Sequence, residues 1–279
     1  MSLNKRKIVY VLGAGRSGTT ITGIVLGATK NFFHCGEINK FYDYNGIPKG
    51  NYQNKEVYNF YKKIYEDCAY KNTKLTNKVE YHSSFFLVYF NLFKKKTIGK
   101  YKLLQEQLFE SLEKNNDYDC LIDSSKFPGR LLALHKFLKL DITVVYIVRN
   151  PISYLRTVQK KGVEQPSQSF IKSLLYYFII NSLSVLAFKK INGKKLKIRF
   201  EDLIEDPIKT INIIEKHTGL SFHESKELIK NNLSIATGNV FEGNRIRHKK
   251  TIKFKVKKNT YFKKNIRELV MNTINGLFY

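Results

Sequence analysis

The segment KIVYVLGAGRSGTTITGIVLGATK, Lys7–Lys30, decides the fold of this chain. It begins with an apolar run rich in β-branched residues, Ile8–Leu12, passes through a glycine-rich polar turn and ends in a run of small and apolar residues, Thr19–Thr29. This order predicts a buried strand, a turn and a helix. Glycines in such a turn let backbone N–H groups face an anion at the start of the helix. The segment therefore predicts an anion site at the end of a strand.

The glycine turn fits two phosphate-binding motifs. Gly13, Gly15 and Gly18 have the spacing of the dinucleotide fingerprint, and the first and last of them also have the spacing of a P-loop. Glu37 lies near the distance at which an acidic residue would hold a ribose hydroxyl in the dinucleotide motif. Thr19 stands where a P-loop has its lysine, which weakens an ATP or GTP interpretation.

Polar side chains make this turn rich in hydrogen-bond donors. Arg16, Ser17, Thr19 and Thr20 supply more donors than a pyrophosphate turn usually needs. The excess favours a terminal, highly charged group over a dinucleotide.

A second strand-to-helix turn occurs in VVYIVRNPISYLRT, 144–157. Arg149 ends the apolar run, Pro151 suits a first helical turn and Thr157 follows two turns later. An arginine buried at the carboxyl end of a strand needs an anionic partner. Two anion sites on one sheet edge predict a nucleotide with phosphates on both sides of its ribose.

Apolar runs and helical segments alternate along the chain, which predicts an α/β fold, a P-loop-like parallel sheet flanked by helices, in one domain over 1–279. The expected strands are Ile8–Leu12, Cys120–Ile122, Thr143–Val148 and Leu196–Phe200. The expected helices are Thr19–Thr29, Tyr101–Lys114, Gly129–Leu138, Ile152–Lys161, Phe170–Lys190, Ile208–Thr218 and Glu224–Asn231.

Residues about 40–115 fit the alternation poorly, because they are aromatic, polar and irregular without an obvious strand. We interpret them as a mostly helical insertion. Insertions in such folds often cover the crevice at the carboxyl ends of the strands, so we expect this one to be an acceptor-recognition lid.

Charge and cysteine content narrow the partners. The chain has 49 basic and 23 acidic residues, a net charge of +26, which predicts anionic ligands, although a general enrichment in lysine, asparagine and isoleucine accounts for part of it. A basic nucleic-acid-binding protein would explain the charge but not the ordered loops, so we expect no specific nucleic acid. The three cysteines are widely separated, which argues against a disulfide framework and a zinc site. No metal is expected.

Two apolar segments bear on location. The N-terminal apolar run enters a glycine turn instead of a cleavage site, and Leu174–Phe188 is shorter than the roughly 20 residues of a membrane span. We expect a cytoplasmic protein in which Leu174–Phe188 is a buried helix, with peripheral membrane contact left open.

Five ordered segments together resemble the sulfotransferases that use 3′-phosphoadenosine 5′-phosphosulfate (PAPS). GAGRSGTT resembles their 5′-phosphosulfate loop and YIVRNPISYLRT their 3′-phosphate element. IDSSKFPGRLLAL, IRFEDLIEDPIKTINIIEKHTGL and GNRIR resemble further family segments. The matches span Ile8–Arg247 and leave out the insertion and the final tail. The resemblance implies a transferase that moves a sulfuryl group from PAPS to a hydroxyl or amine and releases adenosine 3′,5′-bisphosphate.

The resemblance also implies roles for individual residues. The loop residues Gly15, Arg16, Ser17, Gly18, Thr19 and Thr20 would hold the phosphosulfate. Arg149, Thr157, Arg245 and Arg247 would hold the 3′-phosphate. Thr157 replaces the usual serine and keeps its hydroxyl, and Arg16 replaces the lysine of cytosolic members and keeps its charge.

Three residues are candidates for the chemistry. Glu37 in HCGEINKFY would take the acceptor proton, with His34 as an alternative that more often is a packed histidine. Lys126, together with Arg16, would stabilise charge on the transferring group or leaving phosphate. Each also has a structural interpretation, an ordinary salt bridge for Glu37 and a surface position for Lys126.

Other polar residues near these segments are expected to be structural. Asp123, Ser124 and Ser125 would cap the following helix, and Glu201 and Asp202 would pair with buried arginines. The late lysines would form a solvated strand face over Ile252, Phe254 and Val256.

The remaining alternatives are a P-loop nucleotide-dependent kinase, a non-enzymatic nucleic-acid-binding protein and an inactive relative. For the acceptor, family analogy alone points to a carbohydrate or glycoconjugate.

Overall fold

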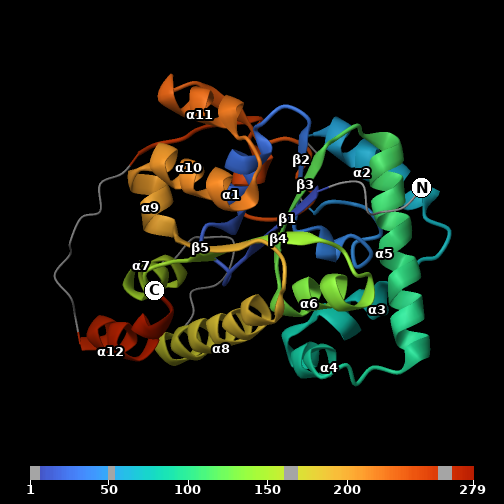
Figure 1. Cartoon of the computed structure of the whole chain (residues 1–279), viewed down its shortest axis with the longest axis horizontal. Coiled ribbons are helices and arrows are strands. Elements are labelled where there is room, and N and C mark those ends of the chain that lie inside the picture. Colours follow the sequence, from blue (N-terminus) through green and yellow to red (C-terminus); the bar gives the residue numbers. More distant parts are fainter. Residues whose placement is uncertain (1–6, 50–53, 160–168, 257–265) are drawn as a thin grey trace.

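A central parallel sheet organises the chain (Figure 1). The computed structural model describes residues 7–49, 54–159, 169–256 and 266–279. The five-stranded sheet has the order β2-β3-β1-β4-β5, and every neighbouring pair is parallel. Its strands are β1 (Lys7–Leu12), β2 (Phe32–Gly36), β3 (Cys120–Lys126), β4 (Ile142–Val148) and β5 (Lys195–Arg199). The predicted α/β fold is confirmed.

Both faces of the sheet are covered, as β1 shows directly. Val9 and Val11 belong to one apolar core, whereas Tyr10 and Leu12 belong to the other. Successive side chains of a strand point to opposite faces, so an uninterrupted apolar run is what a strand between two helical layers requires.

One helical layer contains α1 (Thr19–Gly27), α9 (Phe200–Glu205), α10 (Pro207–Thr218) and α11 (His223–Lys230). The other contains α6 (Pro128–Phe137), α7 (Pro151–Val158) and α8 (Phe170–Lys190), with α12 (Ile266–Asn275) packed on α7 and α8. A short antiparallel pair, β6 (Ser234–Ala236) and β7 (Thr251–Lys253), lies beside the first layer. Short 3₁₀ turns complete the late chain at η4 (Arg245–His248) and η5 (Gly276–Phe278).

The segment 40–115 is helical. It forms α2 (Lys55–Asp67), α3 (Thr73–Glu80), α4 (Phe85–Tyr89) and α5 (Lys95–Asn115), preceded by η2 (Ile38–Lys40) and interrupted by η3 (His82–Ser84). Asn54 and Asn72 cap α2 and α3, because their side chains accept from the backbone N–H groups of Val57 and Leu75. Many of its aromatic side chains are internal: the rings of Phe41 and Tyr61 contact that of Phe241 from the late chain.

Three sequence expectations about elements need correction. The edge strand β2 was not expected, because FFHCG is short and contains a histidine and a glycine. Strand β3 runs four residues further than expected, so Asp123, Ser124 and Ser125 are buried strand residues and not helix caps. The N-cap of α6 is Phe127, which makes no side-chain capping bond. Phe200 starts α9 instead of ending β5.

Helix α8 is, among the described residues, the one helix whose length and composition would permit a membrane span. One side of it is internal: Asn181 is fully buried, and its Oδ1 accepts from the Tyr146 hydroxyl at 2.9 Å. This side packs on α6, α7, β4 and α12. The expectation of a packed helix therefore holds for one face, while the other face is exposed.

The ends of two predicted segments lie outside the described residues. These are the last two residues of the helix expected over Ile152–Lys161 and the lysine-rich stretch after residue 256. Within the described part, Ile252 and Phe254 face the core between exposed lysines, whereas Val256 is exposed.

Candidate functional site

A cavity of about 710 Å³ opens at the carboxyl ends of the strands. It collects residues from the turn after β1, the segment after β2, the end of β3, the turn into α7, the insertion and the late chain. Predicted site residues in its lining are Gly15, Arg16, Gly18, Thr19, Thr20, Glu37, Lys126, Arg149 and Thr157. In open parallel sheets this edge is where ligands bind.

The turn between β1 and α1 is fixed by its glycines. A Cβ at Gly13 would lie 2.7 Å from the carbonyl oxygen of Ile147. Gly18 has φ +94° and caps α1, and a Cβ there would collide with the ring of Phe200. Only glycine meets both conditions at this position. The backbone of the turn therefore approaches the start of α1 closely, as an anion-binding loop requires.

Ser17 lies behind this turn and does not line the cavity. Its side chain is fully buried, and its Oγ has no hydrogen-bond partner among the described residues. The Gly15 N–H donates to the hydroxyl of Tyr176 from α8 at 3.2 Å. The hydroxyl of Ser17 could therefore donate to a ligand only if the conformation of the turn changes.

The turn after β4 is joined directly to the first loop. Arg149 donates from Nη1 to the carbonyl oxygen of Arg16 at 2.8 Å, and its guanidinium lies 5.0 Å from the Phe200 ring centroid. Burial lowers the pKa of Arg149, Glu201 opposes that shift and Arg16 adds to it. Its Nε is buried without a partner among the described residues. A partly desolvated guanidinium beside a second arginine favours an anion.

Helix α7 begins at this turn and carries the second predicted ligand. The side chain of Asn150 caps α7 by accepting from the backbone N–H groups of Ile152 and Ser153. Thr157 lines the cavity, and its hydroxyl donates to the Ser153 carbonyl oxygen at 2.8 Å. Glu201 accepts from the Asn150 N–H, while Asp202 pairs with Arg199 on the exposed side of α9. The expected pairing with buried arginines is not seen: Asp202 pairs with an exposed arginine, and Glu201 acts on the half-buried Arg149 only through its charge.

The segment around η4 contributes to the cavity, but its two arginines do not. Gly243, Asn244 and Ile246 line it, and the Asn244 N–H donates to Thr20 Oγ1 at 3.2 Å. The two predicted arginines are not in the lining. Arg245 is exposed, and Arg247 donates to the Gly243 carbonyl and to Glu242.

Glu37 and Lys126 meet in the cavity. Glu37 is 4% exposed; its Oε1 accepts from Lys126 Nζ at 2.5 Å, and its Oε2 lies 2.9 Å from Lys40 Nζ. Burial alone would raise the pKa of Glu37, but Lys126 and Lys40 outweigh it and lower the pKa to about 2. Lys126 has φ +64°, an uncommon conformation for a residue with a side chain, at the point where β3 ends. Both predicted catalytic residues therefore line the cavity in one ion pair.

His34 does not line the cavity. It is buried against the glycines of α1 and lies 2.8 Å from the Ser124 hydroxyl, and burial lowers its pKa to about 3. The packed interpretation of His34 is supported.

A different histidine was missed by the sequence analysis. His82 lines the cavity from η3, and its ring stacks on Phe127 at a centroid distance of 4.6 Å. Burial, and then Lys126, lower its pKa to about 4, so it is neutral at pH 7. The sequence around His82 contains no motif that would mark it as a site residue. His82 could not be predicted because only the folded chain brings it next to the end of β3.

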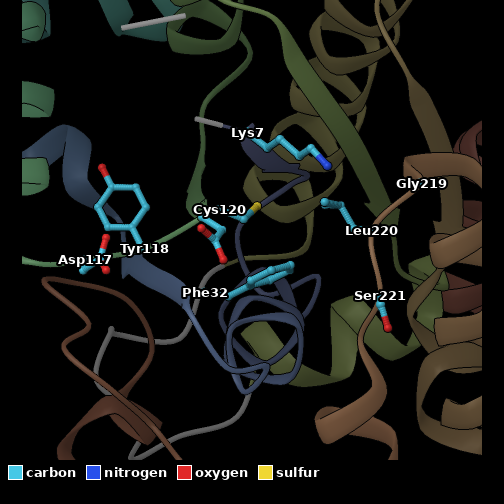
Figure 2. A pocket seen from close by; sticks show the side chains of 9 residues that line it. Lys7, Phe32, Asp117, Tyr118, Cys120, Gly219, Leu220 and Ser221 are labelled. Atoms are coloured by element: carbon cyan, nitrogen blue, oxygen red, sulfur yellow. The ribbon is translucent and has the colours of Figure 1, made fainter. Parts of the chain in front are cut away.

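A second cavity, of about 600 Å³, lies at the opposite edge of the sheet (Figure 2). Its lining includes Lys7, Phe32 and Cys120, the first residues of β1, β2 and β3. It contains none of the predicted site residues. The predicted site residues that line a cavity are therefore all at the carboxyl ends of the strands.

The cavity at the carboxyl ends is strongly cationic. Arg16, Lys40, Lys126 and Arg149 line it, against the carboxylates Glu37 and Asp43. Among the described residues no group of three His, Cys, Asp or Glu side chains is arranged to hold a metal ion. The donor set suits a ligand with more than one anionic group.

Comparisons with known proteins agree with this geometry. The family model described as "Sulfotransferase family" matches residues 9–224, more than half of the chain. A search of curated proteins gives no match.

Two solved structures share the fold across almost the whole chain. The "Sulfotransferase Domain from the Curacin Biosynthetic Pathway" aligns with TM-score 0.50 and 13% identity over 98% of both chains. The "Sulfotransferase Domain from the Synechococcus PCC 7002 Olefin Synthase" aligns with TM-score 0.50 and 14% identity over 98% of this chain and 95% of the other.

The family match decides against a kinase and against a non-enzymatic nucleic-acid-binding protein, and the two strand-to-helix turns and the cationic cavity are consistent with it. The chain belongs to the sulfotransferase family and is a transferase enzyme.

Proposed function

We propose that this enzyme transfers a sulfuryl group from PAPS to a hydroxyl or amine on a carbohydrate or glycoconjugate. The observation that carries the proposal is the hydrogen bond from Arg149 to the Arg16 carbonyl, because it joins the two predicted phosphate elements at the mouth of one cavity. A nucleotide with phosphates on both sides of its ribose is the ligand that uses both elements at once.

The donor would lie along the cationic wall of the cavity. The loop backbone, Arg16, Thr19 and Thr20 would hold the phosphosulfate, with Ser17 supporting the turn from behind. Arg149 and Thr157 would hold the 3′-phosphate. The late segment would contribute through Gly243 and Asn244, with Arg245 and Arg247 joining only if their side chains turn toward the ligand.

The reaction forms a bond between sulfur and the acceptor oxygen while the bond from sulfur to the phosphate oxygen breaks, and the acceptor loses its proton. Arg16 and Lys126 would stabilise charge that develops on the departing phosphate. Glu37 would accept the proton. Its low pKa comes from Lys126 and Lys40, so an anionic donor that draws Lys126 away would raise the pKa of Glu37 and make it a better base.

His82 is a second candidate for the base. It is neutral at pH 7, lines the cavity near Lys126 and has a buried Nδ1 without a partner among the described residues. If Glu37 is the base, Glu37→Gln should lose more turnover than His82→Gln, and the reverse if His82 is the base.

The insertion would recognise the acceptor. Asp43, Tyr44, Asn77, Tyr81 and His82 line the cavity opposite the donor loops. Aromatic faces beside carboxylate and amide groups are suited to the mixed apolar and polar surface of a sugar. We therefore propose that the helical segment 40–115 acts as the lid, and that the reaction takes place in the cytoplasm.

Calorimetry tests the donor site. Adenosine 3′,5′-bisphosphate is titrated beside 5′-AMP, ATP and NAD at low and high salt, with wild type, Arg149→Ala and Arg199→Ala. Arg199 is exposed and outside the cavity lining, so its variant controls for the loss of one charge. Arg149→Ala removes a charge-assisted hydrogen bond and should weaken the binding of the bisphosphate by roughly 10- to 150-fold. Arg199→Ala should leave this affinity unchanged.

Equal, salt-sensitive binding of every nucleotide would contradict the proposal, since bulk charge would then account for binding. Transfer of labelled sulfate from PAPS to a panel of sugars and glycolipids tests the acceptor class separately.

A further inference from the structure

An exposed apolar surface lies on the outer side of α4 and α8. It consists of Phe86, Phe90 and Leu92 from α4 and the turn after it, and Ile171, Leu175 and Ile179 from α8. Each of these side chains is between 49% and 66% exposed. We call this set the α4–α8 face. Figure 1 shows α4, α8 and α12 along one edge of the molecule.

The two helices that carry the face share a support. Both α4 and α8 pack on α6, and Lys190 at the end of α8 lies 5.8 Å from the ring of Tyr89 in α4. The apolar positions on α8 recur every four residues, so they form one stripe, while the opposite stripe is buried. The contact between the rings of Phe178 and Phe278 continues the surface toward α12.

In the described segments that carry the face, lysines are frequent and acidic residues are absent. The sequence from Tyr81 to Gln105 contains five lysines and no aspartate or glutamate, and α8 contains three lysines and neither acid. Lys94, Lys95, Lys96, Lys172 and Lys189 are exposed. On neighbouring α12, Glu268 is buried in an ion pair with Arg156.

We propose that the α4–α8 face docks on an anionic lipid bilayer, with its apolar side chains inserted at the level of the headgroups and its lysines on anionic lipids. Apolar residues beside lysines are the pattern of interfacial membrane binding, because lysines near the surface are attracted to anionic headgroups. A second copy of the chain fits less well, because a twofold contact would bring two lysine-rich faces together.

The cavity adjoins this face. Tyr81, just before α4, and Tyr176 of α8 both line it. A docked enzyme would therefore open toward the headgroup region. As a consequence that rests on the proposed function, the acceptor would be a sugar attached to a lipid or held at the membrane surface. The docking itself does not rest on that function.

Vesicle flotation tests the docking. The full chain, without nucleotide, is mixed with vesicles of phosphatidylcholine alone or with phosphatidylglycerol, at low and high salt. The test variant is Phe90→Ser/Ile171→Ser/Leu175→Ser, which leaves the net charge unchanged. The matched control is Ile213→Ser/Leu233→Ser, since these two apolar residues are also exposed but lie outside the face.

Wild type and control should float with the anionic vesicles, and the triple variant should partition at least about tenfold less, most clearly at high salt, where attraction between charges is screened. Equal binding of the triple variant would overturn the proposal, because charge alone would then suffice. Absence of binding by wild type would overturn it as well. If light scattering shows that wild type and the control variant are dimers and that the triple variant is a monomer, the face is instead the contact between two copies of the chain. Melting curves and bisphosphate calorimetry should be unchanged in the triple variant, which separates this test from that of the donor site.

Discussion

The ion pair between Glu37 and Lys126 makes a quantitative prediction. The pKa of Glu37 is lowered from 4.5 to about 2 by Lys126 and Lys40. A carboxylate whose pKa is lower in the folded protein contributes stability that is present in full above about pH 4.5 and is lost as the pH falls toward 2. At 1.36 kcal/mol per pKa unit this contribution is about 3 kcal/mol at pH 7, and linkage reduces it to about 1 kcal/mol at pH 3.

Glu37→Gln removes the charge and keeps the shape. We expect the free energy of unfolding in urea to fall by about 3 kcal/mol at pH 7, and the gap to wild type to narrow by more than half at pH 3. Glu227→Gln is the matched control, because Glu227 is an exposed carboxylate paired with a single lysine, and it should change little. A gap that is absent at pH 7, or that widens in acid, would refute the ion-pair argument.

The same variant tests the catalytic role. Removing a carboxylate from a cationic cavity should strengthen bisphosphate binding, because repulsion of the ligand is relieved, while the turnover number should fall by 10²- to 10⁴-fold if Glu37 is the general base. If Glu37→Gln binds the bisphosphate more tightly but keeps normal turnover, another group is the general base.

Three further predictions follow from particular contacts. His82→Gln should leave bisphosphate affinity within about twofold of wild type, and a loss of turnover larger than that of Glu37→Gln would identify His82 as the base by steady-state kinetics. Gly18→Ala should lower the unfolding free energy by about 2–4 kcal/mol, measured in urea, because a Cβ at φ +94° strains the backbone and meets the Phe200 ring; an unchanged midpoint would contradict this. Arg130→Met should cost about 3–5 kcal/mol, visible in a thermal melt at pH 7, because it leaves the carboxylates of Asp123 and Glu80 buried without their partner.

The parts of the fold that sequence predicted are those with strong local signals. The run Ile8–Leu12 is apolar on both faces and ends in glycine, and 144–157 joins an apolar strand to a proline-started helix. Both strand-to-helix turns could be predicted for this reason. Helices of the insertion could be predicted as a class, since their residues lack strand patterning, but their packing could not.

Sequence reasoning failed where burial depends on distant partners. The polar end of β3, Asp123 to Ser125, resembles a helix cap because nothing local shows that Arg130 will neutralise the aspartate inside the core. Arg247 lies outside the cavity lining, and its guanidinium donates to Glu242, buried five residues before it; its role toward a phosphate stays a prediction. In both cases the contact of the side chain with a buried carboxylate could not be predicted, because that burial is a property of the assembled fold.

The same buried charges explain how the insertion can be part of the site. Arg130 is fully buried and donates to Asp123 of β3 at 2.9 Å and to Glu80 of α3 at 2.6 Å. Tyr101 and Gln105 of α5 complete the cluster by contacting Glu80 and Arg130. Breaking such a cluster leaves uncompensated charges in the core, so the insertion is held rigidly to the strand that carries Lys126, three residues beyond Asp123. The cavity wall formed by Asn77, Tyr81 and His82 is thereby fixed relative to Lys126, as the proposed role of segment 40–115 in acceptor recognition would require.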